Sequence, residues 1–161
     1  MILSEFNEMK MKHLHPIILD SIKDNGCFNF YPKGVSMLPT IVPSKDMVTL
    51  VSPDCLNKFD IVLYKRQNGQ YVMHRIFKIK DEIYTMCGDN QFTYEKGITK
   101  AQIIAKAKSI TKPDGTVIDC TNKKNTHYAK KLRVKMLQKR LIYRIKCLIY
   151  PLYKVIFKHN N

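Results

Sequence analysis

The sequence lacks any cysteine pattern that would hold a metal ion or a disulfide framework. Its five cysteines are scattered, odd in number and without Cys-x-x-Cys spacing: Cys27, Cys55, Cys87, Cys120 and Cys147. We therefore expect no metal site, no cofactor and no disulfide framework, but reduced and mostly buried thiols that suit a cytosolic body. His13 and His15 would lie on different faces of a helix, so we interpret them as surface residues and not as a metal-binding pair.

The beginning of the chain also lacks a secretory signal. Residues 1–6 include an early acidic residue and start no apolar run of sufficient length, so we expect no cleaved leader and no N-terminal membrane anchor. Glycine and proline are present in ordinary numbers, six and seven in 161 residues, which argues against long disordered regions. With 45% hydrophobic residues, the chain is expected to form one compact domain and an appendage.

Acidic residues are missing from the last quarter of the chain. Residues 121–161 carry 12 basic and no acidic residues, whereas residues 1–120 carry 16 basic and 13 acidic residues, a net charge of only +3. The chain therefore combines a nearly neutral body with a cationic tail. Such a tail favours a phosphate-bearing partner, either lipid head groups or nucleic acid.

The pattern of apolar residues predicts a mainly β protein with a coiled antiparallel core. A helix is expected at residues 4–25, because apolar residues recur there every three or four positions, and Pro16 is expected to kink it or to divide it in two. Residues 91–100 are expected to be a polar loop. Alternating apolar segments predict seven strands, at residues 27–31, 46–51, 59–65, 70–80, 82–87, 103–110 and 116–119.

These elements divide the chain into three parts. We predict an N-terminal helical segment at residues 1–26, a β domain at 27–120 and a basic amphipathic helical tail at 121–161. Within the β domain, Asn68-Gly69 stands between two apolar runs and is the strongest short signal for a hairpin.

The tail combines an apolar helical stripe with many positive charges. The stripe consists of Val134, Leu137, Leu141, Ile145, Leu148, Leu152 and Val155. Residues 141–157 contain three cations, too many for a comfortable transmembrane span, so a helix lying in the membrane interface fits better. Residues 130–158 are therefore predicted to bind an anionic membrane surface peripherally, on either side of the membrane. Packing on the β body or on another subunit is an alternative, and nucleic acid is the least favoured partner.

A constrained serine loop stands near the beginning of the β domain. In Gly34-Val35-Ser36-Met37-Leu38-Pro39-Thr40, a serine lies between a glycine and an apolar run that a proline closes. Glycine permits an unusual turn, and proline fixes its own φ and favours extended geometry in the residue before it. A serine presented in this way becomes a nucleophile only with a neighbouring base. The best candidate is His74, in Val72-Met73-His74-Arg75-Ile76.

Several boxes follow the serine loop in a fixed order. After Ser36-Met37-x-Pro39-Thr40 come Asp46-Met47-Val48, Asp60-Ile61-Val62, His74-Arg75-Ile76 and Gly88-Asp89-Asn90. This series, over residues 31–109, resembles the signal peptidase I family of serine endopeptidases, and most closely its branch with a histidine base. The resemblance implies an all-β catalytic core and cleavage of a signal or leader peptide, which binds in extended form along a strand edge.

The resemblance also implies a role for each residue of the site. Ser36 would attack a peptide carbonyl, and His74 would take the hydroxyl proton and return it to the leaving amine. Asp89 would accept a hydrogen bond from the other ring nitrogen of His74. The backbone N–H of Ser36 is the expected oxyanion donor. The residues expected to support the site structurally are Gly34, Met37, Pro39, Asp60, Arg75 and Gly88, with Arg75 pairing with a carboxylate such as Asp60.

Other interpretations stay open at this point. Lys65 or Lys78 could replace His74 as the base, since a second branch of the family uses lysine; alternation along a strand places His74 and Lys78 on one face. A LexA-like self-cleaving regulator would share the β core, and Cys87-Gly88 is its one potential cleavage site. A non-catalytic relative that binds a membrane or nucleic acid is the third hypothesis.

Overall fold

The structure of the protein is a computed structural model. It describes the backbone of residues 2–157 and the side chains of residues 12–138, 140–145, 147 and 149.

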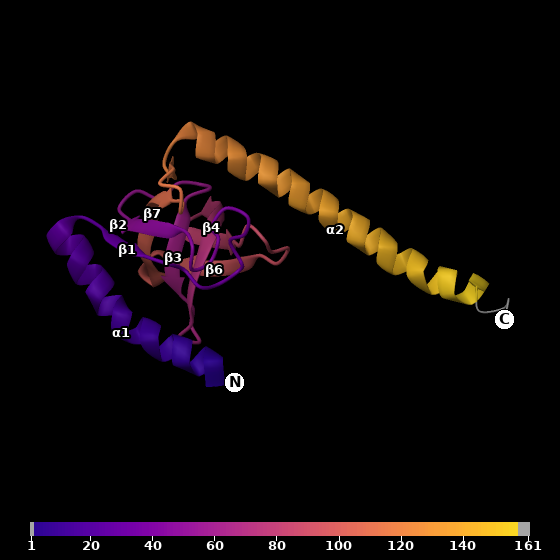
Figure 1. The fold of residues 1–161 in the computed structure, drawn as a ribbon, viewed down its shortest axis with the longest axis horizontal. Helices are drawn as coiled ribbons and strands as arrows, with labels where there is room; N and C mark the ends of the chain where they lie inside the picture. The colour runs from indigo at the N-terminus through magenta and orange to yellow at the C-terminus, as the bar shows by residue number, and fades with distance from the viewer. Residues whose placement is uncertain (1, 158–161) are drawn as a thin grey trace.

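An antiparallel sheet forms the centre of the molecule, with one helix before it and one after it (Figure 1). The main path of the sheet runs β1-β2-β7-β3-β4-β5-β6, and β8 pairs with β7. The helices are α1 (Ile2–Asn25) and α2 (Lys123–Phe157), and a 3₁₀ turn, η1, spans Lys100–Gln102. The strands are β1 (Phe28–Phe30), β2 (Met47–Val51), β3 (Ile61–Lys65), β4 (Tyr71–Lys80), β5 (Ile83–Cys87), β6 (Glu95–Thr99), β7 (Ile103–Thr111) and β8 (Val117–Asp119).

The predicted fold class is confirmed, and the strand positions differ from the prediction in one place. The expected polar loop at residues 91–100 contains β6, which pairs with β5 at the edge of the sheet. This strand reads Glu-Lys-Gly-Ile-Thr and buries only Ile98, so its sequence has little of the alternation by which strands are recognised. The hairpin at Asn68-Gly69 forms as predicted, with Gly69 at a φ of 90° between β3 and β4.

Two apolar clusters hold the fold together. One includes Ile18 of α1 together with Ile41, Leu50 and Ile110, all fully buried, so α1 packs against the sheet through Ile18. The other is centred on the fully buried side chain of Tyr64. Pro16 lies within α1, which is assigned as a single helix.

The alternation of β4 separates two neighbouring polar residues, His74 and Arg75. Successive side chains of a strand point to opposite faces, so these two buried residues serve different surroundings. His74 lies opposite Val62 of β3 and therefore diagonally beside Tyr64, on the same face. Beyond Ile76 the pairing with β5 shifts register, and Lys78 is exposed. Because of this shift, alternation along β4 does not place Lys78 on the same face of the strand as His74.

The two halves of α2 have different environments. Ala129, Leu132 and Met136 are buried against the β body, and the guanidinium of Arg133 lies 5.1 and 4.3 Å from the ring centroids of Phe77 and Tyr94. The described side chains from residue 137 onward are exposed, and this half of the helix extends away from the body (Figure 1). Among the described residues, no helix is long and apolar enough to cross a membrane.

Candidate active site

The loop that carries Ser36 is anchored in the core on one side of the serine. Met37, Thr40 and Ile41 are buried, whereas Val35 is 59% exposed. Ser36 itself is partly exposed and lies between the exposed Val35 and the buried Met37. The peptide bond between Leu38 and Pro39 is cis. The local sequence therefore fixes the loop through its apolar residues and leaves the serine accessible.

The Gly88-Asp89-Asn90 loop holds the serine loop from the other side. The backbone N–H of Asn90 donates to the carbonyl oxygen of Ser36 at 2.8 Å, and the side-chain amide of Asn90 donates to the carbonyl of Val35 at 3.3 Å. A Cβ at Gly88 would lie 2.6 Å from the carbonyl oxygen of Ser36. Glycine is therefore required at position 88 for this close approach.

Gly34 has a smaller role than the sequence suggested. A Cβ added there meets no atom within 4 Å, and the residue is not among those with positive φ. Neither crowding nor backbone conformation therefore requires glycine at position 34, which corrects the expectation of an unusual turn.

The structure places Asp89 with Arg75 and not with His74. The Nε and Nη2 atoms of Arg75 donate to the two oxygens of Asp89 at 2.9 and 2.8 Å, and the hydroxyl of Thr40 donates to the same carboxylate at 2.5 Å. Both oxygens of the Asp89 carboxylate therefore accept hydrogen bonds from Arg75 and from the serine loop. The expected hydrogen bond from His74 to Asp89 does not occur in the described structure, and Asp89 joins β4 to the serine loop instead.

Arg75 and Asp60 are both structural, but they do not pair. Arg75 also donates to the carbonyl of Phe59 at 2.8 Å. Asp60 accepts from the backbone N–H of Asn57 at 2.8 Å and lies 3.7 Å from the ammonium of Lys106. Arg75 thus pairs with a carboxylate as expected, but this carboxylate is Asp89 and not Asp60, because Asp89 offers the arginine both carboxylate oxygens.

His74 is held neutral by its surroundings. Only 1% of the residue is exposed. Burial lowers its pKa from the ordinary 6.5 to about 4; the charge of Glu95 opposes this shift, that of Arg66 adds to it and that of Asp89 opposes it. At pH 7 the imidazole is therefore unprotonated.

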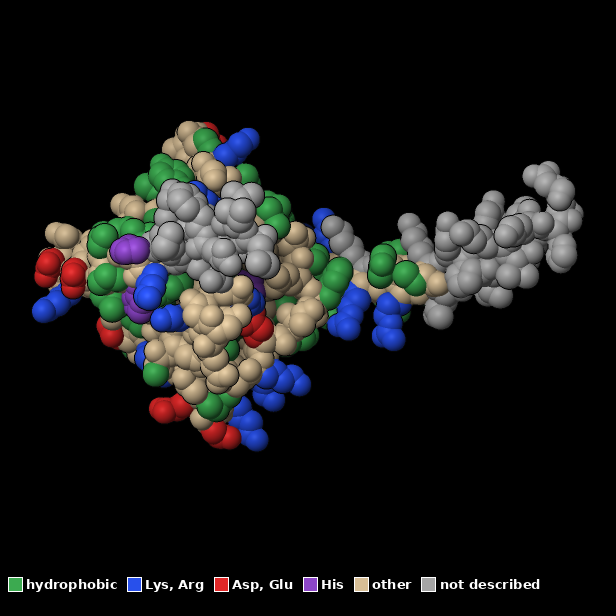
Figure 2. All heavy atoms as spheres, turned by 90° about the horizontal axis from the view of Figure 1, so that it is seen from below, with side chains coloured by type: hydrophobic (Ala, Val, Ile, Leu, Met, Phe, Trp, Pro, Cys, Tyr) green, Lys and Arg blue, Asp and Glu red, His purple; other side chains and the backbone are tan. Residues whose placement is uncertain are grey.

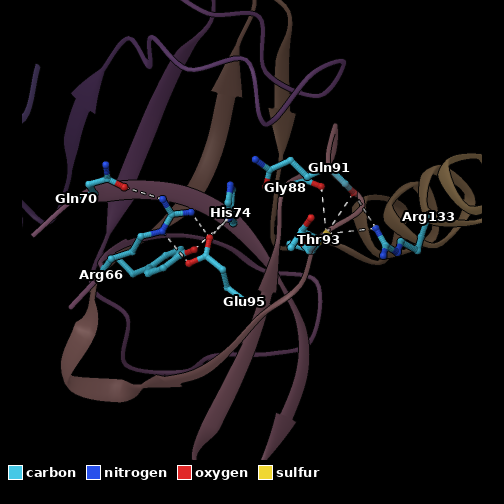
Figure 3. Close-up of polar contacts among 10 residues, drawn as sticks. Arg66, Gln70, His74, Gly88, Gln91, Thr93, Glu95 and Arg133 are labelled. Atoms are coloured by element: carbon cyan, nitrogen blue, oxygen red, sulfur yellow. Dashed lines mark hydrogen bonds and ion pairs between the residues drawn. The ribbon is translucent and has the colours of Figure 1, made fainter. Parts of the chain in front are cut away.

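A chain of polar side chains fixes the orientation of that imidazole (Figure 3). The Nδ1 atom of His74 lies 3.0 Å from the hydroxyl of Tyr64 and 3.5 Å from the carboxylate of Glu95. The hydroxyl of Tyr64 also interacts with Glu95 and with Arg66. Arg66 donates to Glu95 through Nε at 2.8 Å and through Nη2. Burial raises the pKa of Tyr64 well above its ordinary value, as does the charge of Glu95, so its hydroxyl keeps its proton.

This chain selects one tautomer of His74. Burial raises the pKa of Glu95, but the hydrogen bonds from Arg66 and Tyr64 and the charges of Arg66 and His74 together outweigh it and keep the pKa below its ordinary value. An ionised carboxylate can only accept, so Glu95 at 3.5 Å from Nδ1 of His74 favours the tautomer that carries its proton on Nδ1. The lone pair is then on Nε2, which is the arrangement that a general base requires.

Ser36 and His74 meet at one groove. The groove has a volume of about 510 Å³ and is lined by both residues together with apolar side chains that include Leu14 of α1, Met37 and Met73. No hydrogen bond joins the hydroxyl of Ser36 to His74 in the described part of the chain. Catalytic hydrogen bonds are often long without substrate and tighten in the complex.

The two lysines considered as alternative bases lie elsewhere. The ammonium of Lys65 lies 5.6 Å from the ring centroid of Tyr71, and Lys78 is exposed beyond the irregular pairing of β4. Neither lines the groove that Ser36 and His74 share. Of the three candidates, His74 alone reaches this groove in the described structure.

Sequence reasoning missed Glu95, Tyr64 and Arg66 as residues of the site. Glu95 lies in the segment predicted to be a polar loop, and the family resemblance points to Asp89 as the carboxylate of the site. Tyr64 belongs to β3, which is buried over its first four residues and shows no alternation, and Arg66 follows the end of that strand, so neither residue carries a local signal for the site. The position of Glu95 depends on the pairing of β5 with β6, which no local pattern reveals.

The cysteines and histidines form no metal site in the described residues. All five cysteines are free; Cys87 and Cys120 are buried, Cys27 is partly buried, and the other two are exposed. The expectation that most thiols are buried is therefore wrong. Burial raises the pKa of Cys87 and raises that of Cys120 to about 11, so neither is an activated nucleophile.

No family model, curated protein or solved structure matches the chain. We therefore infer function from the side chains of the site.

Proposed function

We propose that the protein is a serine endopeptidase of the signal peptidase type, which cleaves signal or leader peptides with Ser36 as nucleophile and His74 as general base. The main support is that a partly exposed serine and a neutral histidine line the same apolar groove. The predominantly apolar lining suits an extended peptide with uncharged side chains.

In the proposed reaction, the Nε2 atom of His74 takes the hydroxyl proton as the oxygen of Ser36 bonds to the peptide carbonyl carbon. The C–N bond then breaks, and His74 returns the proton to the leaving amine, which leaves an acyl ester on Ser36. Water, deprotonated by His74, hydrolyses this ester and restores the serine. The backbone N–H of Ser36 is the proposed donor to the oxyanion.

Glu95 takes the role that the sequence had suggested for Asp89. When His74 becomes protonated during the reaction, the nearby carboxylate stabilises the positive charge, with Tyr64 transmitting the interaction through its hydroxyl. Asp89 instead positions the nucleophile, because its loop binds the serine loop through Thr40 and Asn90.

The experiment that tests this proposal is cleavage of a peptide library with small side chains before the cut, read by mass spectrometry. We expect Ser36→Ala and His74→Ala to lose at least about 1000-fold in rate while keeping the fold. The matched control, Ser52→Ala, removes a partly exposed hydroxyl outside the groove and should leave the rate unchanged.

Three outcomes contradict the proposal in different ways. A Ser36→Ala variant as active as the parent would exclude the nucleophile. Loss of activity in Lys65→Ala but not in His74→Ala would identify another base. If the purified protein cuts only itself, at Cys87-Gly88, the LexA-like alternative replaces the peptidase.

A further inference from the structure

The described apolar residues of the stripe on α2 are Val134, Leu137, Leu141 and Ile145, and they point away from the body that the helix packs against. With about 3.6 residues per turn, the contact residues Ala129, Leu132 and Met136 lie on one side of the helix. Val134 and Leu141 lie on the opposite side and are 56% and 61% exposed. The β body therefore packs against one face of α2 and leaves a second apolar face exposed to solvent.

This second face, which we call the outer stripe, continues along the free half of the helix. It consists of Val134, Leu137, Leu141, Ile145 and Ile149, each at least 46% exposed. Arg140 and Arg144 are also exposed and lie along one border of the stripe. Figure 2 shows basic and apolar side chains next to one another where the helix leaves the body.

We propose that the outer stripe binds the interface of an anionic lipid membrane, with its apolar residues in the head-group region and its arginines on lipid phosphates. Such a surface offers apolar and anionic groups together to one face of a helix. Nucleic acid would pair with the cations but leave the apolar residues in water. A second copy would bring two rows of arginines together, because residues 121–161 contain no acidic residue.

The membrane then lies on the side of α2 that faces away from the β body. The contacts of Arg133 with Phe77 and Tyr94 fix the first half of the helix to the body, so the body is held to the membrane by a firmly attached helix. This inference does not depend on the proposed peptidase activity.

Flotation of the full-length protein with lipid vesicles tests the proposal. Vesicles of phosphatidylcholine with 30% phosphatidylglycerol should bind the protein, and vesicles of pure phosphatidylcholine should bind it weakly. We expect Arg140→Gln/Arg144→Gln to weaken binding by about 5-fold for each charge removed. Leu141→Ser/Ile145→Ser should weaken binding by at least about 10-fold, because it removes apolar contact.

Lys123→Gln/Lys124→Gln is the matched control. It removes the same number of exposed charges from the first turn of α2, at the end of the helix remote from the free half, and should leave vesicle binding nearly unchanged. Circular dichroism checks that all variants keep the fold. Equal losses in both charge variants would contradict the proposal, because binding would then follow net charge and not the stripe.

Two further results would overturn the proposal. One is a dimer in analytical ultracentrifugation that Leu141→Ser/Ile145→Ser dissociates, with no vesicle binding by the parent. The other is salt-dependent binding of a nucleic-acid duplex without vesicle binding.

Discussion

The two carboxylates near His74 have opposite kinds of surroundings. Asp89 is buried, accepts three hydrogen bonds from Arg75 and Thr40, and is part of the structure that holds the serine loop. Glu95 lies on the edge strand β6, keeps 24% of its side chain exposed, and connects through Tyr64 to the histidine. The first carboxylate is positioned to stabilise the fold, and the second to tune the proposed base.

The difference shows that a sequence motif can hold a site together structurally without providing the catalytic group that was expected from it. The Gly-Asp-Asn box binds the nucleophile loop through Asp89, Asn90 and the close approach of Gly88. Orientation of the histidine falls instead to β3 and β6, on either side of the strand hairpin β4–β5. The two halves of the proposed catalytic apparatus are thus held by separate parts of the sheet.

The largest expected effect is on stability, from Asp89→Ala. This change leaves the Arg75 guanidinium buried without its carboxylate, and breaking a buried pair in this way costs about 3–5 kcal/mol. Urea unfolding measures the loss. The matched double variant Asp89→Leu/Arg75→Met should recover most of the stability, because it removes both charges and fills the space. A single variant as stable as the parent would show that the ion pair does not hold the loop.

Glu95→Gln is expected to act on catalysis more than on stability. Its ion pair with Arg66 is partly exposed, so the loss of stability should stay below about 1 kcal/mol. Without the negative charge, the protonated form of His74 is less stabilised, and we expect kcat to fall by about 10- to 100-fold. The glutamine oxygen can still accept a hydrogen bond and so preserves the tautomer.

The pH profile separates this role from a merely structural one. Because Glu95 raises the pKa of His74 against burial, its neutralisation should move the acid limb of kcat/KM to lower pH. A structural defect would lower the rate without moving the limb. An unchanged rate and limb in Glu95→Gln would return the orienting role to Asp89.

The sequence predicted those parts of the site that depend on local pattern. Ser36 and His74 could be found because each lies in a short box, and the antiparallel strands could be placed because β-branched and apolar residues alternate in them. The partners of Arg75 and Asp89 could not be predicted, since they are set by which strands lie side by side. Glu95 was missed for the same reason: the pairing of β6 buries a single apolar residue and leaves little local trace.

The last expected effect is the pH dependence that His74 gives to stability. The fold lowers the pKa of His74 from 6.5 to about 4, so between these pH values the unfolded chain takes up a proton that the folded protein does not. The free energy of unfolding therefore falls as pH drops through this window, by at most about 1.4 kcal/mol per pH unit, and His74 contributes no further loss below pH 4. Urea unfolding at pH 7, 6 and 5 should show this slope in the parent and a shallower one in His74→Gln. The difference between the two proteins isolates His74 from other titrating groups. Parallel slopes would mean that His74 is not kept neutral by burial, and the proposed base would then be charged over part of the range in which the groove must accept a proton.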